Sequence, residues 1–330
     1  MTKKILKVFL INVFLILIIL VLLESGARIF NLSQLMGIEV KIIDDTKKKI
    51  HYLKPNSSGK VFGADAFFDF YGYRVPSLNY KYKSEDKIFV IGDSVAFGNG
   101  VLENLSFPGI MRKNLKNYEI YNTSVFGYQT KHYNLRLNEL DKFQPIKKIF
   151  YFVTLNDVFK SSNVIKKEIN RENNYDKTKL EKIINLNFIK NLNDNLRDKS
   201  YFWMFLKGKL IDPQKVWFTN VLDYYKKNDL KNFNFFINNL KNKSKDLGSE
   251  LTIFILPYEF QTRNCNSKVL LPQSKIRDIL VSSDVEFFDF TRVFCENNNP
   301  KKLFYKFDPM HLSEKGHKLV YNEILKEKFK

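Results

Sequence analysis

The chain has 330 residues, of which 44% are hydrophobic, enough to bury one substantial core. Its formal net charge of +19 invites a nucleic-acid partner, but that partner requires Lys and Arg clustered on one surface. Here the lysines are scattered among Asn, Ile, Phe and Tyr, as in residues 226–245, which indicates composition bias and a solvated surface. We expect one main domain and no nucleic-acid partner, while an anionic surface or glycan stays compatible with the charge.

Residues 1–30 predict an N-terminal membrane anchor or signal segment. Residues 8–23 are apolar except for Asn12, follow three lysines, and reach the length of a bilayer together with their flanks. The excess of positive charge before this run predicts a single-pass helix with its N-terminus cytoplasmic and the remainder periplasmic or extracellular. Secretion after cleavage at Ser25-Gly26-Ala27 is the alternative. We favour the uncleaved anchor, because the run is long for a signal peptide and Glu24 precedes the small residues.

Residues 31–85 have mixed composition and no long periodic pattern. Residues 55–59 read Pro-Asn-Ser-Ser-Gly, which is typical of a break, and aromatic side chains cluster over residues 67–73. We expect a stalk followed by a lead-in that packs on the main domain.

Five short apolar runs predict buried β-strands in residues 86–330. They occupy residues 87–91, 118–121, 148–153, 251–256 and 285–290. Helical patterns alternate with them, including residues 130–143 and 232–247. This alternation predicts an α/β fold with a mainly parallel five-stranded sheet. Residues 161–219 interrupt the alternation and predict a helical insertion.

Ser94 follows the first predicted strand in the sequence Gly-Asp-Ser. In open α/β sheets the reacting groups collect at the carboxyl ends of the strands. A serine at the start of a helix also lies beside unpaired backbone amides, which can stabilise a developing anion. Taken alone, the motif is better explained as a turn with an N-capping serine.

Asp308 and His311 lie three residues apart near the end of the chain. An Asp at this spacing can accept the Nδ1 proton of the imidazole in a tight turn and leave Nε2 free to take a proton from a serine. Of the other histidines, His51 lies in the predicted stalk, His132 has no nearby acid upstream, and His317 follows Glu314 by three residues but in a stretch that reads as helix. We expect these three at the surface or in packing.

Two further residues follow the second and third predicted strands. Gly127 could bring a backbone N–H close to a ligand, and the Asn156 side chain could donate to the same oxyanion. Taken singly, Gly127 also suits a turn and Asn156 a cap. Their order at successive strand ends favours a shared site with Ser94.

Cys265 and Cys295 are the only cysteines, and both fall in the part predicted to be exported. They can form one disulfide or remain two free thiols. No Cys/His spacing indicates zinc, so we expect neither a metal nor a cofactor.

These motifs together resemble the SGNH, or GDSL-type, hydrolase superfamily, whose Ser, Gly, Asn and His blocks follow one another in this order. The resemblance covers roughly residues 86–325. It departs from the family at Thr154, where the family usually has Gly, and at Val95, where Leu is usual. The resemblance implies a flavodoxin-like three-layer sandwich.

The resemblance also implies an activity for the site. Ser94 would be the nucleophile, His311 the base and Asp308 its orienter, with the Ser94 and Gly127 amides and the Asn156 side chain as the oxyanion hole. The expected substrate is an acyl or acetyl ester of an envelope or extracellular glycan or lipid. An O-acyltransferase that modifies a surface polysaccharide is the alternative, and a non-catalytic glycan-binding domain is less compatible with the complete residue set.

Overall fold

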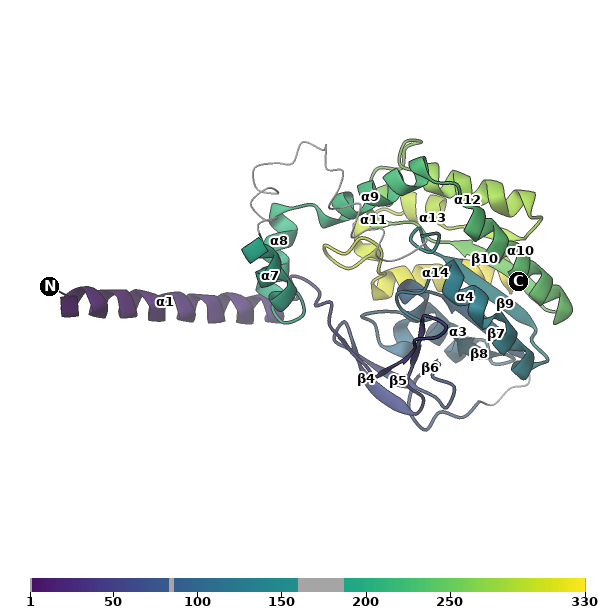
Figure 1. The fold of residues 1–330 in the computed structure, drawn as a ribbon, viewed down its shortest axis with the longest axis horizontal. Coiled ribbons are helices and arrows are strands. Elements are labelled where there is room, and N and C mark those ends of the chain that lie inside the picture. The colour runs from purple at the N-terminus through teal and green to yellow at the C-terminus, as the bar shows by residue number, and fades with distance from the viewer. Residues whose placement is uncertain (1, 83–85, 160–186, 330) are drawn as a thin grey trace.

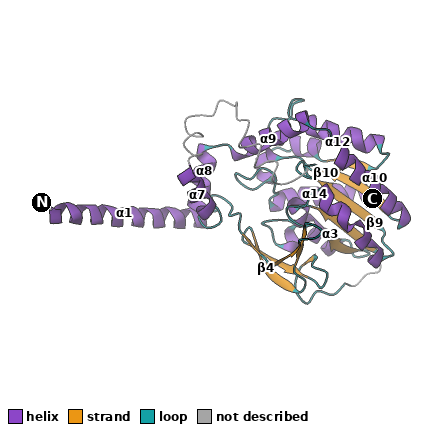
Figure 2. Cartoon of the chain, viewed as in Figure 1, coloured by secondary structure: helices purple, strands orange, loops and turns teal. Residues whose placement is uncertain are grey.

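The computed structural model describes residues 2–82, 86–159 and 187–329. A long N-terminal helix leads into an α/β body, in which helices cover a twisted sheet (Figures 1 and 2). Residues 161–186 of the predicted insertion lie outside the described residues. Its described part is helical and consists of α7 (Asn187–Leu196), α8 (Tyr201–Leu210) and the first half of α9 (Pro213–Lys227).

The five predicted strands form the parallel centre of the sheet. They are β7 (Lys87–Gly92), β8 (Glu119–Asn122), β9 (Lys148–Val153), β10 (Glu250–Ile255) and β11 (Phe287–Asp289). Their spatial order is β8-β7-β9-β10-β11, and all neighbours in this set run parallel. This is the flavodoxin-like strand order, in which the first strand in sequence lies second in space.

The sheet is larger than predicted and mixed, so the expectation of a mainly parallel five-stranded sheet is corrected. It has nine strands, because four antiparallel strands continue it beyond β8. These are β1 (Ile38–Glu39), β4 (Ser57–Val61), β5 (Ala64–Phe68) and β6 (Arg74–Val75). A separate hairpin is formed by β2 (Ile42–Asp45) and β3 (Ile50–Leu53).

Gly59 explains why β4 was not predicted from the sequence. The strand lies on the Pro-Asn-Ser-Ser-Gly stretch that reads as a break, yet Gly59 pairs across to β5 while β1 runs along its other side. A Cβ at Gly59 would lie 2.1 Å from the carbonyl oxygen of Glu39. The glycine permits this close approach of two backbones, a role that glycine also has inside strands.

Adjacent residues of β9 show which helices cover each face, since consecutive side chains of a strand point in opposite directions. The Phe150 ring faces Phe329, directly after α14 (Glu314–Lys328), at a centroid distance of 6.2 Å. The Tyr151 ring faces Phe236 of α10 (Lys231–Asp246) at 5.2 Å. The packing partners extend the two layers, because α3 (Phe107–Asn114) contacts α14 and α4 (Thr130–Arg136) contacts α10.

Shorter elements complete the body. They are α2 (Ser94–Phe97), α11 (Glu259–Thr262), α12 (Leu271–Ser282), α13 (Thr291–Cys295) and the 3₁₀ turns η1 (Glu103–Leu105), η2 (Leu137–Phe143) and η3 (Pro300–Leu303). A disulfide joins Cys265, just after α11, to Cys295 at the end of α13, with the Cα atoms 6.0 Å apart. The bond ties the segment after β10 to the segment that leads to Asp308.

The first helix, α1 (Thr2–Ile29), projects from the body (Figure 1). Its segment Lys4–Ile29 has a mean hydropathy of 3.1 over its most apolar window, and none of that window is buried. By length and composition this helix can cross a membrane, and the same properties fit a signal sequence.

Candidate active site

Ser94 begins α2 immediately after β7, at the carboxyl edge of the parallel strands. Asp93 caps this short helix, because its carboxylate accepts the Val95 N–H at 2.9 Å. The helix ends at Gly98, whose φ of 88° is a left-handed conformation that glycine adopts readily. The tight turn leaves the Ser94 hydroxyl at the strand end, as the Gly-Asp-Ser motif predicts.

His311 and Asp308 approach Ser94 from the loop that precedes α14. The Ser94 Oγ lies 2.8 Å from His311 Nε2, and His311 Nδ1 lies 2.8 Å from Asp308 Oδ2. The second carboxylate oxygen of Asp308 accepts the backbone N–H groups of Met310 and His311 at 2.9 and 2.7 Å. Because Asp308 accepts from Nδ1, Nε2 of the neutral imidazole is an acceptor for the serine hydroxyl.

Two opposing effects act on the pKa of His311. Burial disfavours the charged imidazolium, but the Asp308 carboxylate stabilises it by charge and by a hydrogen bond. The carboxylate outweighs burial and raises the pKa above the ordinary histidine value. The arrangement therefore makes His311 a stronger base toward Ser94.

Behind Ser94, the hydroxyl of Thr154 lies between two buried carboxyl groups. Thr154 Oγ1 is 2.8 Å from Asp93 Oδ2 and 3.3 Å from Asp157 Oδ1. Burial raises the pKa of both carboxyl groups, and the charge of Asp93 raises that of Asp157 further. The Thr154 hydroxyl has a single hydrogen to donate, and Asp93 is the nearer of the two acceptors.

Asn156 is held in the same network. Its Oδ1 accepts the Tyr258 hydroxyl at 2.5 Å and lies 3.0 Å from Thr154 Oγ1, and its Nδ2 donates to Asp93 at 3.3 Å. The second amide hydrogen of Asn156 has no acceptor among the described residues. The side chain is thus fixed with one donor still available.

Gly127 lies at the carboxyl end of β8, in the loop before α4, with a φ of 75°. Within the described residues, no hydrogen bond or ring contact joins it to Ser94, so the network that links Ser94 to Asn156 does not include it. The Ser94 and Gly127 N–H groups donate to no acceptor in the described part of the chain. Both amides therefore have a free hydrogen-bonding position.

The loop that carries Gly127 is supported from the hairpin of β2 and β3. His51 Nε2 donates to the carbonyl of Phe126 at 3.0 Å, and the Tyr128 hydroxyl donates to the His51 carbonyl. Below the loop, Arg136 pairs with Glu139 at 2.9 Å.

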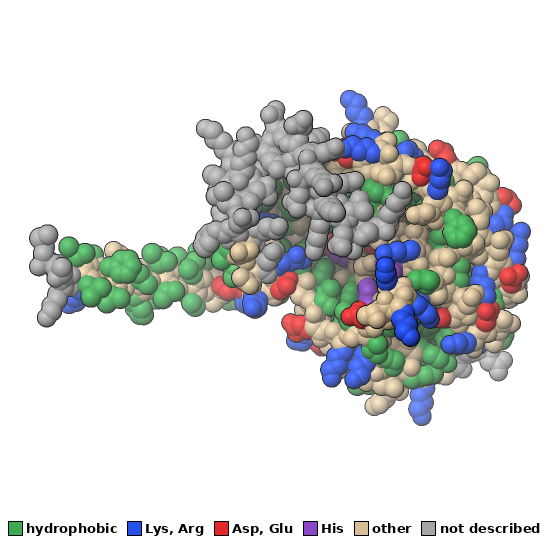
Figure 3. Space-filling view, viewed as in Figure 1, with side chains coloured by type: hydrophobic (Ala, Val, Ile, Leu, Met, Phe, Trp, Pro, Cys, Tyr) green, Lys and Arg blue, Asp and Glu red, His purple; other side chains and the backbone are tan. Residues whose placement is uncertain are grey.

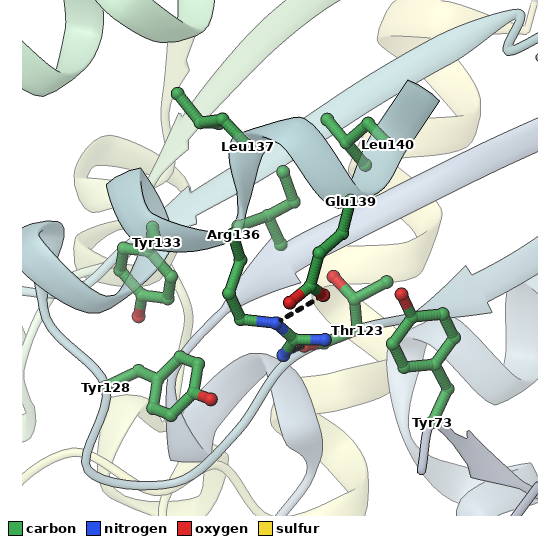
Figure 4. A pocket seen from close by; sticks show the side chains of 9 residues that line it. Tyr73, Thr123, Tyr128, Tyr133, Arg136, Leu137, Glu139 and Leu140 are labelled. Carbon is green, nitrogen blue, oxygen red and sulfur yellow. Dashed lines mark hydrogen bonds and ion pairs between the residues drawn. The ribbon is translucent and has the colours of Figure 1, made fainter. Parts of the chain in front are cut away.

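Figure 4 shows the pocket around this pair, which none of the Ser94, His311 and Asp308 side chains line. The Arg136 guanidinium lies over the rings of Tyr52, Tyr73 and Tyr128 at 5.4 to 5.8 Å. The Arg136 side chain therefore fills the space between these aromatic rings. One of the rings, Tyr128, directly follows Gly127, so the packing of Arg136 supports the Gly127 loop.

Phe62 covers His311 from the tip of the hairpin between β4 and β5. The two rings meet edge to face at 5.0 Å, and Phe62 is buried. Phe62 adopts a φ of 52°, held by a hydrogen bond from its N–H to the Gly37 carbonyl at 2.8 Å. The N-terminal strands thus contribute a wall beside the imidazole.

Arg74 supports the turn that follows Ser94. Its guanidinium is fully buried and donates to the carbonyl oxygens of Phe97, Gly98 and Val101 at 2.6 to 2.7 Å. The guanidinium thereby binds carbonyl groups at the end of α2 that the helix leaves unpaired.

The structure brings Ser94, Asp308, His311 and Asn156 to one end of the sheet, with Gly127 on the adjacent strand end. Among the described residues, no cluster of three or more His, Cys, Asp or Glu side chains could hold a metal ion. The three other histidines pack within the body, His132 in a helix cap and His317 against Phe107.

Sequence reasoning missed Tyr258 and Phe62. Tyr258 follows β10 at the same edge of the sheet, so its position after a predicted strand was a usable signal. Phe62 had no such signal, because its strands were not recognised.

Solved structures show a distant likeness to this chain. No protein-family model and no curated protein matches the sequence. A member of the lipolytic protein G-D-S-L family from Veillonella parvula is 13% identical, with a TM-score of 0.43, over 74% of this chain and 98% of that one. The chain is similar to G-D-S-L family proteins.

Two further solved structures have a similar relation to the chain. A variant of an acetylxylan esterase from Geobacillus stearothermophilus is 13% identical, with a TM-score of 0.44, over 76% of this chain and 98% of that one. A lipase/acylhydrolase from Enterococcus faecalis is 11% identical, with a TM-score of 0.41, over 72% and 95%. At this degree of likeness the argument for chemistry rests on the geometry of the site.

Proposed function

We propose that the protein is a serine-dependent ester hydrolase with Ser94 as nucleophile, His311 as general base and Asp308 as its orienting carboxylate. The observation that carries this proposal is the pair of 2.8 Å contacts from Ser94 Oγ to His311 Nε2 and from His311 Nδ1 to Asp308. A buried serine, imidazole and carboxylate in this order match the requirements of acyl transfer.

In the first half of the reaction, Ser94 Oγ attacks the ester carbonyl carbon while its proton passes to His311 Nε2. Asp308 stabilises the imidazolium that forms. The tetrahedral oxyanion is bound by the Ser94 and Gly127 amides and the Asn156 side chain, each of which has a donor free. His311 then protonates the departing alcohol oxygen, which leaves an acyl group on Ser94.

In the second half, His311 takes a proton from water, and the resulting hydroxide oxygen bonds to the acyl carbon. The bond to Ser94 Oγ breaks and the serine recovers its proton from His311. One acid and one alcohol are released for each ester and water consumed. Each oxyanion donor contributes about 3 kcal/mol of transition-state stabilisation in enzymes of this kind.

The test uses the purified full chain in detergent with activated acetyl and short-chain acyl esters. We expect release of the acid, and we expect Ser94→Ala to abolish it. Ser58→Ala, on exposed β4, is the matched control and keeps full turnover. Equal turnover by Ser94→Ala and the unchanged protein would refute the assignment of the nucleophile.

Hydrolysis and transfer use the same acyl-enzyme and differ in the acyl acceptor. The acceptor is water in hydrolysis and a glycan hydroxyl in transfer. With a glycan acceptor added, a hydrolase releases free acid at an unchanged rate. An acylated glycan as the main product would instead identify an O-acyltransferase.

We also propose that α1 is an uncleaved anchor, with the catalytic body on the periplasmic or extracellular side. The proposal is supported by the apolar length of α1 and by the lysines that precede it. The substrate class follows from this location and is an acyl or acetyl ester of an envelope glycan or lipid.

A further inference from the structure

The C-terminal turns of α1 are docked on α8. The Glu24 carboxylate accepts the Ser200 hydroxyl at 2.8 Å and the backbone N–H groups of Tyr201 and Phe202 at 3.1 and 3.0 Å. These amides belong to the first turn of α8, where N–H groups lack partners inside the helix and favour negative charge. A residue of the apolar helix therefore caps a helix of the body.

Arg28, one turn later, adds a second set of contacts. Its Nε pairs with Glu24 at 2.7 Å, its Nη2 donates to the Lys199 carbonyl at 2.7 Å, and its guanidinium lies 5.0 Å from the Tyr201 ring centroid. Between these two residues, Ala27 is only 1% exposed. The turn from Glu24 to Arg28 thus forms a joint with α8. These contacts distinguish α1 from a tether that moves freely relative to the body.

This joint determines where α8 lies relative to α1. Figure 1 shows α7 and α8 against the end of α1, between that helix and the sheet. In Figure 3, α1 is apolar on the side in view, and charged side chains gather where it meets the body. In a bilayer crossed by α1, the first charged residues after the apolar run mark the headgroup level.

The side chains around the joint suit that level. Aromatic residues begin α8 as Tyr-Phe-Trp-Met-Phe, and aromatic rings are enriched at membrane interfaces. Large apolar side chains are exposed on both sides of the joint; they are Ile29, Phe30, Leu206 and Leu210. The exposed Lys209 follows on α8, and long basic side chains can extend from apolar surroundings to phosphate groups.

We propose that α8 is a membrane-interface helix, held at the lipid headgroups by Glu24 of the anchor. The proposal rests on the membrane location of α1 proposed above. The partner is a lipid surface, which contacts the exposed apolar side chains of α8 and of the end of α1.

Helix α8 also contacts the loop that carries Asp308 and His311, and the contact is made at Gly208. A Cβ at this position would lie 2.2 Å from Cγ of Phe307, so α8 packs directly on that ring. Phe307 has a φ of 62° and immediately precedes Asp308. The helix that contacts lipid therefore also supports the loop that carries Asp308 and His311.

Tryptophan fluorescence tests the proposal, because the chain has two tryptophans, Trp203 on α8 and Trp217 on α9. The full chain with Trp217→Phe is reconstituted into vesicles whose lipids carry bromine near the headgroup. We expect Trp203 to lose fluorescence intensity relative to vesicles of the same lipids without bromine. In the matched variant Trp203→Phe, we expect Trp217, which packs against the core, to keep its intensity.

Glu24→Ala in the Trp217→Phe background tests the joint itself. Loss of the cap should release α8 and reduce the quenching of Trp203, whereas Glu39→Ala, an exposed residue of β1, should not. Equal Trp203 intensity with and without bromine, in protein that sediments with the vesicles, would overturn the inference and leave the proposed anchor intact. Failure to sediment would refute both, and ester turnover of the same samples tests the proposed chemistry separately.

Discussion

His311 illustrates how a single side chain is tuned by its neighbours. Burial lowers its pKa and Asp308 raises it, with the carboxylate prevailing. A general base must be neutral to accept a proton, so turnover falls as the pH drops through this pKa. Because the pKa is raised, we expect the acid limb of kcat/KM above the ordinary histidine value of about 6.5.

Asp308→Asn should move this limb and lower the rate. Without the carboxylate the imidazolium loses its main stabilisation, so the pKa of His311 falls and the acid limb moves to lower pH. The amide also favours the wrong tautomer, and kcat should fall by on the order of 10⁴. A pH profile of the variant checks both effects, and an unchanged acid limb would contradict the role of Asp308.

Thr154 is one of the two residues at which the chain departs from the motifs it resembles, and it contacts both buried carboxyl groups beside Ser94. Thr154→Val keeps the shape but removes the hydroxyl between Asp93 and Asp157. We expect the free energy of unfolding to fall by about 1 to 3 kcal/mol, because the buried Asp93 carboxylate loses a donor. Asn156 also loses a support, so kcat should fall by about tenfold or more.

Thr154→Ser is the matched control for this change, since it keeps the hydroxyl. It should retain near-normal stability and turnover in the same denaturation and ester assays. If the Val and Ser variants behave alike, the hydroxyl does not have this role.

At this scale, the sequence predicted residues whose partners are close in the chain or lie at strand ends. Asp308 and His311 are three residues apart, and Ser94 and Asn156 follow predicted strands directly. The partners of Thr154 and Phe62 depend on contacts across the sheet. The spacing of residues along the chain cannot predict contacts between residues so distant in sequence.

Among the elements, the short helix α2 depends on a residue from a distant strand. Arg74 of β6 donates to three carbonyl groups after Ser94, and its fork of N–H groups suits this arrangement. Arg74→Lys keeps the charge but cannot reach all three carbonyls. We expect the free energy of unfolding to fall by about 2 to 4 kcal/mol, measured by chemical denaturation.

Arg292→Lys is the corresponding control, because the Arg292 side chain is 85% exposed and pairs only with Glu296 at the surface. Exposed ion pairs contribute little to stability. Equal denaturation midpoints for the two variants would contradict the structural role of Arg74.

The elements also show where sequence patterns mislead. The five parallel strands were predicted because they are continuous apolar runs between helical patterns. The antiparallel strands β4 and β5 are only partly buried, and β4 contains the Gly59 that reads as a break. Short strands of this kind resemble loops until their partners are known.

For the molecule as a whole, the disulfide is the single covalent link between distant described segments. Cys265 and Cys295 are 30 residues apart, and in the chain-entropy model closing such a loop stabilises the folded state by about 3 to 4 kcal/mol. We expect the double variant Cys265→Ser, Cys295→Ser to lose this amount. Thermal unfolding in the absence of reductant measures it, and an unchanged midpoint would contradict the prediction.

The contact between Phe62 and His311 has a consequence for the order of events during synthesis. The strands that present Phe62 leave the ribosome first, whereas Asp308 and His311 leave near the end, and Ser94 alone is separated from His311 by 217 residues. Contacts this distant in sequence form late and slowly. The nascent chain therefore carries unpaired strand edges, and Ser94 lacks its contact with His311, until almost the whole chain has been synthesised.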